Sequence, residues 1–363
     1  MSVLNLAREL KNQGHAICVG FGTGEFLSTE LEKNNIPFVR FKSLIRTHNP
    51  FKNLYFVWEF KKYLDANGFD IVHINSSNAL AGALAAKLSK KKPKTIFTFR
   101  GLSLLDPNYD KNIFLKNIYK AYFKFFLRFI DKKVFVSKFN YDFALKNNIT
   151  DGRSTSVITN GIDYASLRFY EKEKAMSILS GHLQTDLKDK LLIGSIGRLC
   201  YAKNYEFLIT IFPKILKQLP NAVLIIIGSG EEKERLAKMR KKYGLGNNIF
   251  FAGVLNNAAK YIKAFDVFTL CSRYEGLSIT LIEALASGVP ILASRVGGNS
   301  EVLGNFEPEL YELDVMDEYI DKLSRLVPES PERNLAIESN SKQVEKYNIQ
   351  KTAEEYLKTY SRK

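Results

Sequence analysis

Residues 271–290 read CSRYEGLSITLIEALASGVP, and they follow directly after the apolar run Val267–Leu270. The apolar run predicts a buried strand, and the residues after it predict a turn and then a helix over Thr280–Ser287. The helix is expected to end at Gly288, because glycine adopts the left-handed conformation that closes many helices. A strand, a turn, a helix and a second strand in this order are typical of one repeat of a parallel sheet. This stretch therefore predicts an α/β fold.

The same alternation continues on both sides of this stretch. Strands are expected at Ala16–Gly20, Asp70–Asn75, Thr95–Phe99, Lys133–Val136, Ser156–Ile158, Leu191–Ile196, Ala222–Ile227, Ile249–Phe251, Val267–Leu270 and Pro290–Ala293. Helices are expected at Leu4–Gln13, Ala79–Ser89, Asn204–Gln218, Glu232–Tyr243 and Thr280–Ser287. Most strand runs are continuously apolar, which suits parallel strands that helices cover on both faces. The chain therefore predicts a doubly wound α/β architecture.

Two domains are expected, because 363 residues exceed the length over which one hydrophobic core usually grows. The strong turn signal Asn160-Gly161 follows a strand, and a charged, poorly periodic stretch comes later at Glu171–Lys190. We place the first domain at residues 1–163 and the second at residues 164–340. The segment of about 341–363 has a helical pattern of its own.

The cationic excess is concentrated in the first half of the chain. The formal net charge is +15; residues 1–180 contain 28 Lys and Arg against 15 Asp and Glu, and the rest contains 25 against 23. A basic half favours an anionic partner, such as nucleic acid, a phosphorylated glycan or an anionic membrane. Solubility alone is the other interpretation of this charge.

Composition argues against several other classes. Cys18, Cys200 and Cys271 lie far apart, which disfavours a disulfide framework or a zinc site and fits a reducing cytosol. No secretory signal is visible, and no apolar run reaches the length of about 18 residues that a transmembrane helix needs. We therefore expect a cytoplasmic protein, with a peripheral location on the inner face of the plasma membrane as the alternative.

Two cations follow the expected strand Leu191–Ile196, one in the segment Gly197-Arg198-Leu199 and one at Lys203. Open α/β sheets bind ligands at the carboxyl ends of their strands. Arg198 and Lys203 together suit a diphosphate, through bidentate and point-charge contacts. Two solvated loop cations are the alternative interpretation.

Glycines follow two further strands. Gly228 and Gly230 come after Ala222–Ile227, and Gly297-Gly298 comes after Pro290–Ala293. Each set either lets a ligand approach the backbone closely or simply makes a turn.

Two carboxylates flank the start of the helix in the stretch quoted first. Glu275 precedes Gly276 and Leu277. Ser278 is the expected cap of the helix, and Glu283 lies eight residues after Glu275. The amides at this helix start can bind a phosphate. The two carboxylates are then within about 12 Å of each other, so that one reaches a ribose and the other faces the reacting sugar.

The segments GRLCYAKN, GSGE, FAG, CSRYEGLSITLIEALASGVP and GGNSE stand in this order within residues 197–301. In this order they resemble the retaining family 4 glycosyltransferases of the GT-B fold, and NLARELKNQGH, DIVHINSS and VITNGID extend the likeness weakly into the first half. The resemblance implies two Rossmann-like domains that face each other across a cleft, with the C-terminal helix crossing back onto the first domain. It also implies transfer of a hexose from a UDP- or GDP-linked sugar to a polysaccharide, lipopolysaccharide or lipid-linked acceptor, with retention of configuration.

The resemblance assigns roles to the residues named above. It implies that Arg198 and Lys203 bind the donor diphosphate and that Glu283 bonds the ribose. Glu275, with the backbone of Gly276–Ser278, would contact the transferred sugar or a phosphate. The implied donor site comprises Gly197, Arg198, Lys203, Gly228, Gly230, Glu275, Gly276, Leu277, Ser278 and Glu283. Catalysis would rest on Glu275, Arg198 and Lys203 without a metal or cofactor, because cations and helix amides stabilise the leaving diphosphate.

The sequence departs from the family in two places. It starts with the expected first helix, so the first strand and its glycine-rich loop are expected to be missing, and an upstream extension should raise soluble yield and activity. The second departure is Arg100-Gly101, which follows Thr95–Phe99 where many relatives have a histidine. Arg100, with Asn75, is a candidate for the acceptor side that binds an anionic sugar or phosphate, or else a surface charge. His73 is expected to be structural.

The stretch Lys111–Lys133 combines seven cations with many aromatic residues. Phe114, Ile118, Tyr122 and Phe125 recur near helical spacing. A basic amphipathic helix can lie on an anionic bilayer, which would suit a lipid-linked acceptor, or it can pack on a core with a solvated cationic face.

Three other functions compete with glycosyl transfer. A nucleotide-sugar epimerase of the same fold needs an acid and base pair that the sequence does not reveal. A basic nucleic-acid-binding module is disfavoured because no known motif is present. A dinucleotide oxidoreductase is suggested by Gly20, Gly22 and Gly24, but their spacing does not fit G-x-G-x-x-G.

Overall fold

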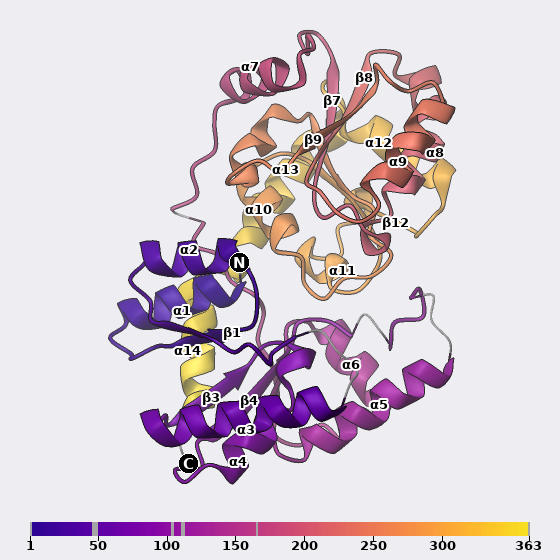
Figure 1. Cartoon of the computed structure of the whole chain (residues 1–363). Coiled ribbons are helices and arrows are strands. Elements are labelled where there is room, and N and C mark those ends of the chain that lie inside the picture. Colours follow the sequence, from indigo (N-terminus) through magenta and orange to yellow (C-terminus); the bar gives the residue numbers. More distant parts are fainter. Residues whose placement is uncertain (1, 46–49, 103–104, 110–112, 165, 362–363) are drawn as a thin grey trace. The chain divides into compact units, whose positions relative to one another are not determined.

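The computed structural model describes residues 2–45, 50–102, 105–109, 113–164 and 166–361 (Figure 1). The chain divides into two compact units, one formed by Met1–Ile162 with Tyr347–Lys363 and the other by Asp163–Lys346. The division lies one residue from the boundary that the sequence predicts. The last helix belongs to the first unit, although the second unit separates them in sequence.

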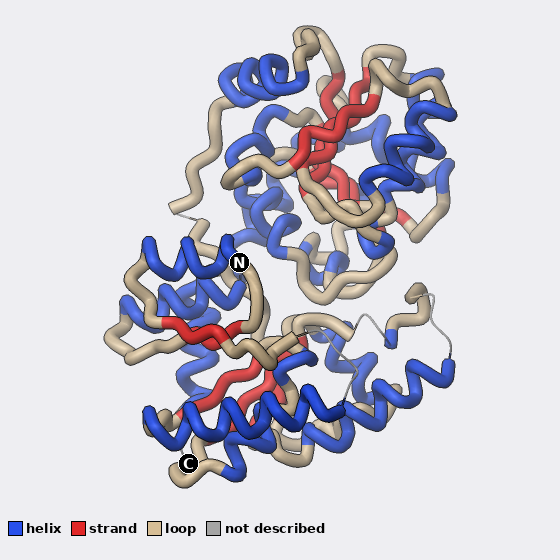
Figure 2. The backbone as a smooth tube through the Cα atoms, in the orientation of Figure 1, coloured by secondary structure: helices blue, strands red, loops and turns tan. Residues whose placement is uncertain are grey.

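The second unit contains a six-stranded parallel sheet in the order β12-β11-β10-β7-β8-β9. The strands are β7 (Leu191–Ile196), β8 (Ala222–Ile227), β9 (Ile249–Gly253), β10 (Val267–Leu270), β11 (Ile291–Ser294) and β12 (Leu310–Tyr311). Every residue of β7, β8, β10 and β11 is buried, which explains their continuously apolar sequences. Helices lie on both sides of this sheet (Figure 2).

The strand order of the second unit reverses between β7 and β10. From β7 the chain proceeds through β8 to β9 on one side, and β10, β11 and β12 then continue from β7 on the other side. The carboxyl ends of β7 and β10 are therefore neighbours whose following loops diverge. Ligands of open α/β sheets bind at such a switch point.

The helices of the second unit include α10, which begins at its cap Ser278 and ends at Gly288 with φ of +75°. They are α7 (Lys172–Leu183), α8 (Tyr205–Gln218), α9 (Lys233–Lys242), α10 (Ile279–Ser287), α11 (Asn299–Val302), α12 (Met316–Leu326) and α13 (Pro331–Val344). The apolar faces of α8 and α12 meet the sheet around Phe207, Tyr311 and Tyr319, whose rings pack within 6 Å of one another.

The first unit contains two separate parallel sheets. One pairs β1 (Val19–Phe21) with β2 (Phe38–Arg40), and the other has the order β3-β4-β5-β6. The strands of the second sheet are β3 (Ile71–Ile74), β4 (Lys94–Phe99), β5 (Lys132–Phe135) and β6 (Thr155–Val157). The predicted absence of a first strand concerns a segment outside the sequence, and it stays a prediction.

The first unit combines helices from the first part of the chain with one from its end. Its α-helices are α1 (Ser2–Asn12), α2 (Glu25–Lys33), α3 (Pro50–Asn67), α4 (Gly82–Leu88), α5 (Ile113–Leu127), α6 (Lys138–Lys146) and α14 (Ile349–Tyr360). Leu6 and Leu10 of α1 pack with Tyr356 of α14 against Ile96 and Val134 of the sheet. The C-terminal helix is thus part of the core of the first unit.

The predicted doubly wound α/β fold is confirmed, and three strands have the predicted bounds. The charged, poorly periodic stretch Glu171–Lys190 contains the helix α7, whose buried Ala175 and Leu179 stand one turn apart among charged residues. One prediction was wrong. The segment of about 341–363 is not one helix, because Glu345–Tyr347 forms a 3-10 turn between α13 and α14. Across the part of the chain that the structure describes, no helix combines the length and apolarity needed to cross a bilayer.

Candidate functional site

The loops that follow β7 and β10 meet at the switch point of the second unit. Lys203 Nζ lies 2.5 Å from Glu275 Oε1, and the Ser272 hydroxyl donates to the same oxygen at 2.7 Å. Only 17% of the Lys203 side chain and 14% of the Glu275 side chain are exposed. The structure therefore brings together two of the residues that the sequence assigns to the donor site.

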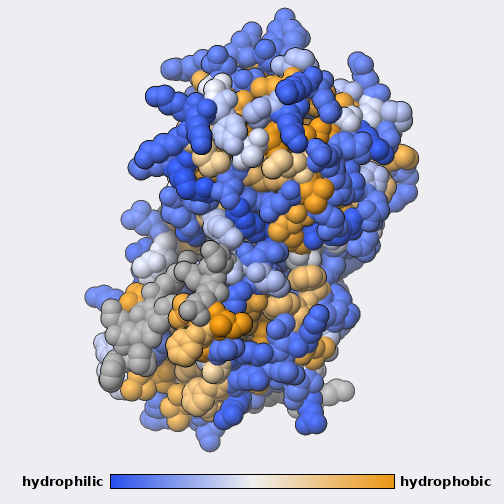
Figure 3. Space-filling view, turned by 90° about the vertical axis from the view of Figure 1, so that its right-hand side faces the viewer, coloured by the Kyte–Doolittle hydropathy of each residue, from blue (hydrophilic) through white to orange (hydrophobic). Residues whose placement is uncertain are grey.

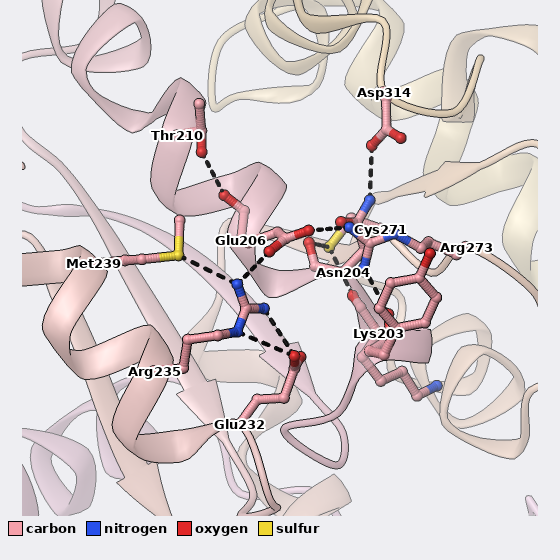
Figure 4. Close-up of polar contacts among 11 residues, drawn as sticks. Lys203, Asn204, Glu206, Thr210, Glu232, Arg235, Met239, Cys271, Arg273 and Asp314 are labelled. Atoms are coloured by element: carbon pink, nitrogen blue, oxygen red, sulfur yellow. Dashed lines mark hydrogen bonds and ion pairs between the residues drawn. The ribbon is translucent and has the colours of Figure 1, made fainter. Parts of the chain in front are cut away.

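The backbone that carries Lys203 is fixed by the loop after β10. Cys271 Sγ donates to the carbonyl oxygen of Lys203 at 3.1 Å, and Arg273 N donates to that of Ala202 at 2.8 Å. Asn204 adopts a left-handed conformation and donates from Nδ2 to Asp314 Oδ1 at 2.8 Å (Figure 4). Lys203 is thus presented by a loop whose main chain is held at both ends.

Arg273 belongs to this site, although no role was predicted for it from the sequence. Its guanidinium stacks on the Tyr201 ring, with 4.2 Å from Cζ to the ring centroid, and donates to the Glu206 carboxylate. Glu206 also accepts from Arg235, so that it lies between two guanidinium groups, whereas the amino group of Lys203 points away from this network (Figure 4). Burial opposes ionisation of Glu206, but the hydrogen bond from Arg235 and the charges of both arginines keep its pKa below the ordinary value. The signal in the sequence is the place of Arg273, just beyond β10 at the switch point.

Arg198 lies in the same loop but pairs with a different carboxylate. Its Nη2 is 3.0 Å from Glu231 Oε2 in the loop after β8, and both side chains are 58% exposed. Arg198 and Lys203 share no partner among the described residues. The site therefore holds two cations that are each neutralised separately.

The glycines of the site let neighbouring loops approach each other. A side chain on Gly228 would overlap the carbonyl oxygen of Gly197, and one on Gly230 would overlap that of Leu199. A Cβ on Gly197 would lie 3.3 Å from Cε of Lys203, so the lysine side chain passes directly over this glycine. The space beside Gly228 and Gly230 is thus occupied by the backbone of the loop after β7.

The start of α10 forms the opposite wall of the switch point. Ser278 Oγ accepts from Leu281 N at 3.3 Å and caps the helix, and Leu277 is buried. Gly298 N donates to the carbonyl oxygen of Gly276 at 3.1 Å, which ties the segment before α11 to this loop. The positive end of a helix therefore lies on the loop that also carries Glu275.

Glu283 lies in the second turn of α10 and is half-buried. Burial raises the pKa of its carboxyl to about 7, so this group exchanges its proton near neutral pH. No described residue forms a hydrogen bond or ion pair with it. The structure does not bring Glu283 into contact with Lys203 or Glu275, and its predicted ribose role stays a prediction.

In the first unit, Arg100 and Asn75 contact each other, as their shared assignment to the acceptor side requires. Arg100 Nη2 donates to Asn75 Oδ1 at 2.6 Å. His73 is bonded at both ring nitrogens, to Tyr360 and Thr98 at 2.7 Å each, and burial followed by the charge of Arg100 lowers its pKa to about 3. The predicted structural role of His73 agrees with these bonds, because a neutral, doubly bonded ring fixes α14 to the sheet.

The predicted amphipathic stretch Lys111–Lys133 divides into separate elements. Lys111 lies outside the described residues, α5 ends at Leu127 and β5 begins at Lys132. Phe123 and Leu127 are buried in the core, whereas five apolar side chains are at least 48% exposed, at Ile113, Phe114, Leu115, Ile118 and Phe125. Figure 3 shows hydrophobic side chains among polar ones in the lower part of the view, where this unit lies. The helix α5 therefore packs against the core with one side and exposes apolar side chains on the other.

Comparisons with known proteins agree with this architecture. Residues 1–166 match the family described as Glycosyltransferase Family 4, and residues 183–344 match Glycosyl transferases group 1. An uncharacterized glycosyltransferase of Methanocaldococcus jannaschii is 30% identical over 273 residues, which are 72% of this chain and 62% of that protein. The UDP-Gal:alpha-D-GlcNAc-diphosphoundecaprenol alpha-1,3-galactosyltransferase of Escherichia coli is 27% identical over 82% of this chain and 77% of its own length.

A solved structure shows the same fold over almost the whole chain. Anabaena HepE in complex with UDP and glucose superposes with a TM-score of 0.82 at 19% identity, covering 99% of this chain and 94% of that one. A sucrose-phosphate synthase of Thermosynechococcus elongatus superposes with a TM-score of 0.79 over 99% of this chain and 91% of that one. At these identities the likeness concerns the fold.

Proposed function

Because the chain belongs to glycosyltransferase family 4 and has the GT-B fold, we propose that it transfers a hexose from a nucleotide sugar with retention of configuration. The proposed donor is a UDP- or GDP-linked sugar, and the proposed acceptor is a polysaccharide, lipopolysaccharide or lipid-linked glycan. HepE binds UDP and glucose, and the Escherichia coli relative acts on a diphosphoundecaprenol-linked sugar, which supports both choices.

The observation that carries this proposal is the Lys203–Glu275 pair at the switch point. Lys203, Arg198 in the same loop and the amide end of α10 are three positive groups at the carboxyl edge of this sheet, and a departing diphosphate gains negative charge. In the proposed bound state Lys203 leaves Glu275 for a phosphate oxygen, which frees the carboxylate to accept from a sugar hydroxyl. Glu283 would bond the ribose diol, and no metal would be needed for the phosphates.

We further propose that α5 docks the first unit on an anionic membrane that presents the acceptor. The exposed side chains of Leu115, Ile118 and Phe125 can enter the lipid interface. Lys120, Lys124 and Arg128 belong to the same stretch and would meet anionic headgroups.

A donor panel tests the proposed function. Full-length protein is titrated with UDP-sugars, GDP-sugars, NAD and a nucleic-acid oligomer while thermal unfolding is followed, and hydrolysis of each nucleotide sugar is measured in parallel. A donor at 100 times its Kd should stabilise the fold by about 2.7 kcal/mol. Stabilisation and slow hydrolysis with one nucleotide-sugar class support the proposal. Stabilisation by NAD or the oligomer alone, with no response to any nucleotide sugar, rejects it.

A further inference from the structure

We infer that the carboxyl edge of the four-stranded sheet in the first unit is a binding site for an oxyanion, a carboxylate or a phosphate, held by Arg100. Arg100 directly follows β4, and its two terminal nitrogens reach the loops after β3 and β6. Nη2 donates to Asn75 Oδ1 at 2.6 Å, and Nη1 donates to Asn160 Oδ1. The guanidinium therefore spans three of the four strands at their ligand-binding edge.

The two partners of Arg100 are neutral amides, and no carboxylate of the described residues forms an ion pair with it. Its Nε is shielded from solvent and has no hydrogen-bond partner. A guanidinium has five N–H donors and stays charged at any pH at which proteins fold, so at least one donor and the whole positive charge are unsatisfied. Burying a charge without a counter-ion is unfavourable, which indicates that the counter-ion comes from a ligand.

The groups around Arg100 cannot supply the missing negative charge. Thr98 Oγ1 lies 2.7 Å from His73 Nε2 and 3.0 Å from the Tyr356 hydroxyl, and Tyr360 bonds the other ring nitrogen of His73. These are neutral groups, because burial keeps the imidazole deprotonated and raises the pKa of Tyr356 above its ordinary value. These polar, uncharged neighbours do not neutralise Arg100, so its positive charge is left for an incoming anion.

The expected ligand follows from the shape of the guanidinium. A planar fork binds carboxylate and phosphate oxygens in pairs, which favours these two groups over halides or hydroxyls. If the proposed glycosyl transfer is correct, on which this assignment rests, the sugar or acceptor that reaches the first unit carries a uronic carboxylate or a phosphate. The side chain of Arg100 keeps partial exposure, so a ligand can reach it.

The test compares charged and neutral probes on the full chain. Glucuronate is compared with glucose, and glycerol 3-phosphate with glycerol, by calorimetric titration of the wild type, Arg100→Gln, Asn160→Asp and Arg240→Gln. The wild type should bind at least one charged probe tenfold or more tightly than its neutral counterpart. Arg100→Gln should lose that preference. Asn160→Asp should also lose it while its Tm rises, because the new carboxylate neutralises Arg100 from within.

Arg240→Gln is the matched control for adventitious binding. Arg240 donates to the carbonyl oxygen of Ile249 and, like Arg100, has a shielded Nε without a hydrogen-bond partner and no carboxylate partner among the described residues. It differs in lining a basic surface depression with Lys238 and Lys241. Its removal should leave the preference intact. The inference is overturned if the wild type does not discriminate charged from neutral probes, if both first-unit variants retain the preference, or if Arg240→Gln abolishes it. Should Arg100→Gln fail to fold, Asn160→Asp decides alone.

Two further readouts distinguish a carboxylate ligand from a phosphate ligand, and the Arg100 site from the glycosyltransferase proposal. Binding of glucuronate alone assigns a carboxylate sugar, and binding of glycerol 3-phosphate alone assigns a phosphate. UDP and GDP are titrated into the same proteins, and Arg100→Gln should keep the nucleotide affinity of the wild type. Absence of nucleotide binding beside a retained oxyanion preference would reject the glycosyltransferase proposal and leave the Arg100 site standing.

Discussion

The two units balance the cations at the carboxyl ends of their sheets in different ways. In the second unit, Lys203 and Arg198 each pair with a carboxylate, Glu275 and Glu231. In the first unit, Arg100 donates to two amide oxygens and pairs with no carboxylate of the described residues. The ligand proposed for the second unit would therefore displace an existing ion pair, whereas the one proposed for the first unit would supply a missing charge.

A buried acid in the second unit sharpens this comparison. Glu309 is fully buried, and its Oε1 accepts from Ile291 N at 2.7 Å and from Asn340 Nδ2 at 2.9 Å, while its Oε2 has no partner. Like Arg100, it has amides in place of a counter-ion. Burial raises its pKa to about 8, so the acid can become neutral by taking up a proton. An arginine cannot lose its charge in this way, so Arg100 stays cationic beside its amide partners.

The largest expected effect comes from the contact between the loops of the second unit. Gly228→Ala should lower the free energy of unfolding by about 2–4 kcal/mol, because the new Cβ would overlap the Gly197 carbonyl oxygen at a φ of +147°. Denaturant titration measures this loss. Gly246→Ala is the control, since nothing lies within 4 Å of a Cβ there and its φ is not positive. Equal stability of the two variants would show that the loops are not held together in this way.

Glu309 should make the stability of the protein depend on pH. An ordinary glutamate loses its proton near pH 4.5, whereas folded Glu309 keeps it to about pH 8, so the unfolded state binds fewer protons in this window. Stability should therefore fall as pH rises from 4.5 to 8, by up to about 1 kcal/mol per pH unit, and level off above.

Glu309→Gln isolates this contribution. Its amide oxygen can keep both accepted hydrogen bonds and has no proton to lose, so the variant should gain stability relative to the wild type as pH rises. The comparison is made by urea titration at pH 5, 6.5 and 8.5. Parallel pH profiles of the two proteins would show that Glu309 ionises normally.

Lys203→Gln tests the proposed exchange at the switch point. The variant should bind UDP or GDP roughly 10- to 100-fold more weakly, because one charge-assisted hydrogen bond to phosphate is worth about 1.5–3 kcal/mol. Lys172→Gln is a matched control, since Lys172 pairs at 2.6 Å with Asp266 at the opposite, amino end of β10. The control should keep nucleotide affinity. Equal losses in both variants would mean that general charge, and not the switch point, attracts the nucleotide.

The smallest effect is expected for membrane binding by α5. Leu115→Ser with Ile118→Ser should reduce partitioning to anionic vesicles about fivefold at low salt, since about 1 kcal/mol of apolar contact is lost. Co-sedimentation measures the bound fraction. Leu335→Ser is the control, because Leu335 is 56% exposed on α13 of the second unit. Unchanged partitioning of the double variant, or no binding by the wild type, removes the proposed docking surface.

Sequence predicts this molecule best where burial alone decides the structure. The runs Leu191–Ile196 and Ala222–Ile227 are buried on both faces, so apolar continuity marks their bounds. Short strands give a weaker signal. The three-residue strands β1 and β6 were predicted with shifted bounds, and β2 and β12, of three and two residues, were not predicted. The helix α7 was missed since lysines and glutamates surround its two buried positions.

The candidate site could be predicted by residue type but not by pairing. The order of motifs placed Lys203 and Glu275 in one site, although they stand 72 positions apart. Arg198 instead pairs with Glu231, and Arg273 contacts Tyr201 and Glu206. These contacts depend on how three loops fold against one another. No local pattern encodes such contacts, because each loop draws its partners from distant strands.

The return of α14 to the first unit has a consequence for how the protein is made. Tyr356 and Tyr360 complete the core and the hydrogen bonds around Thr98 and His73, yet they are translated after the entire second unit. The core of the first unit is therefore incomplete until α14 has been synthesised, whereas the second unit is continuous in sequence and does not depend on it. Synthesis of α14, rather than of the first half of the chain, completes the core of the first unit.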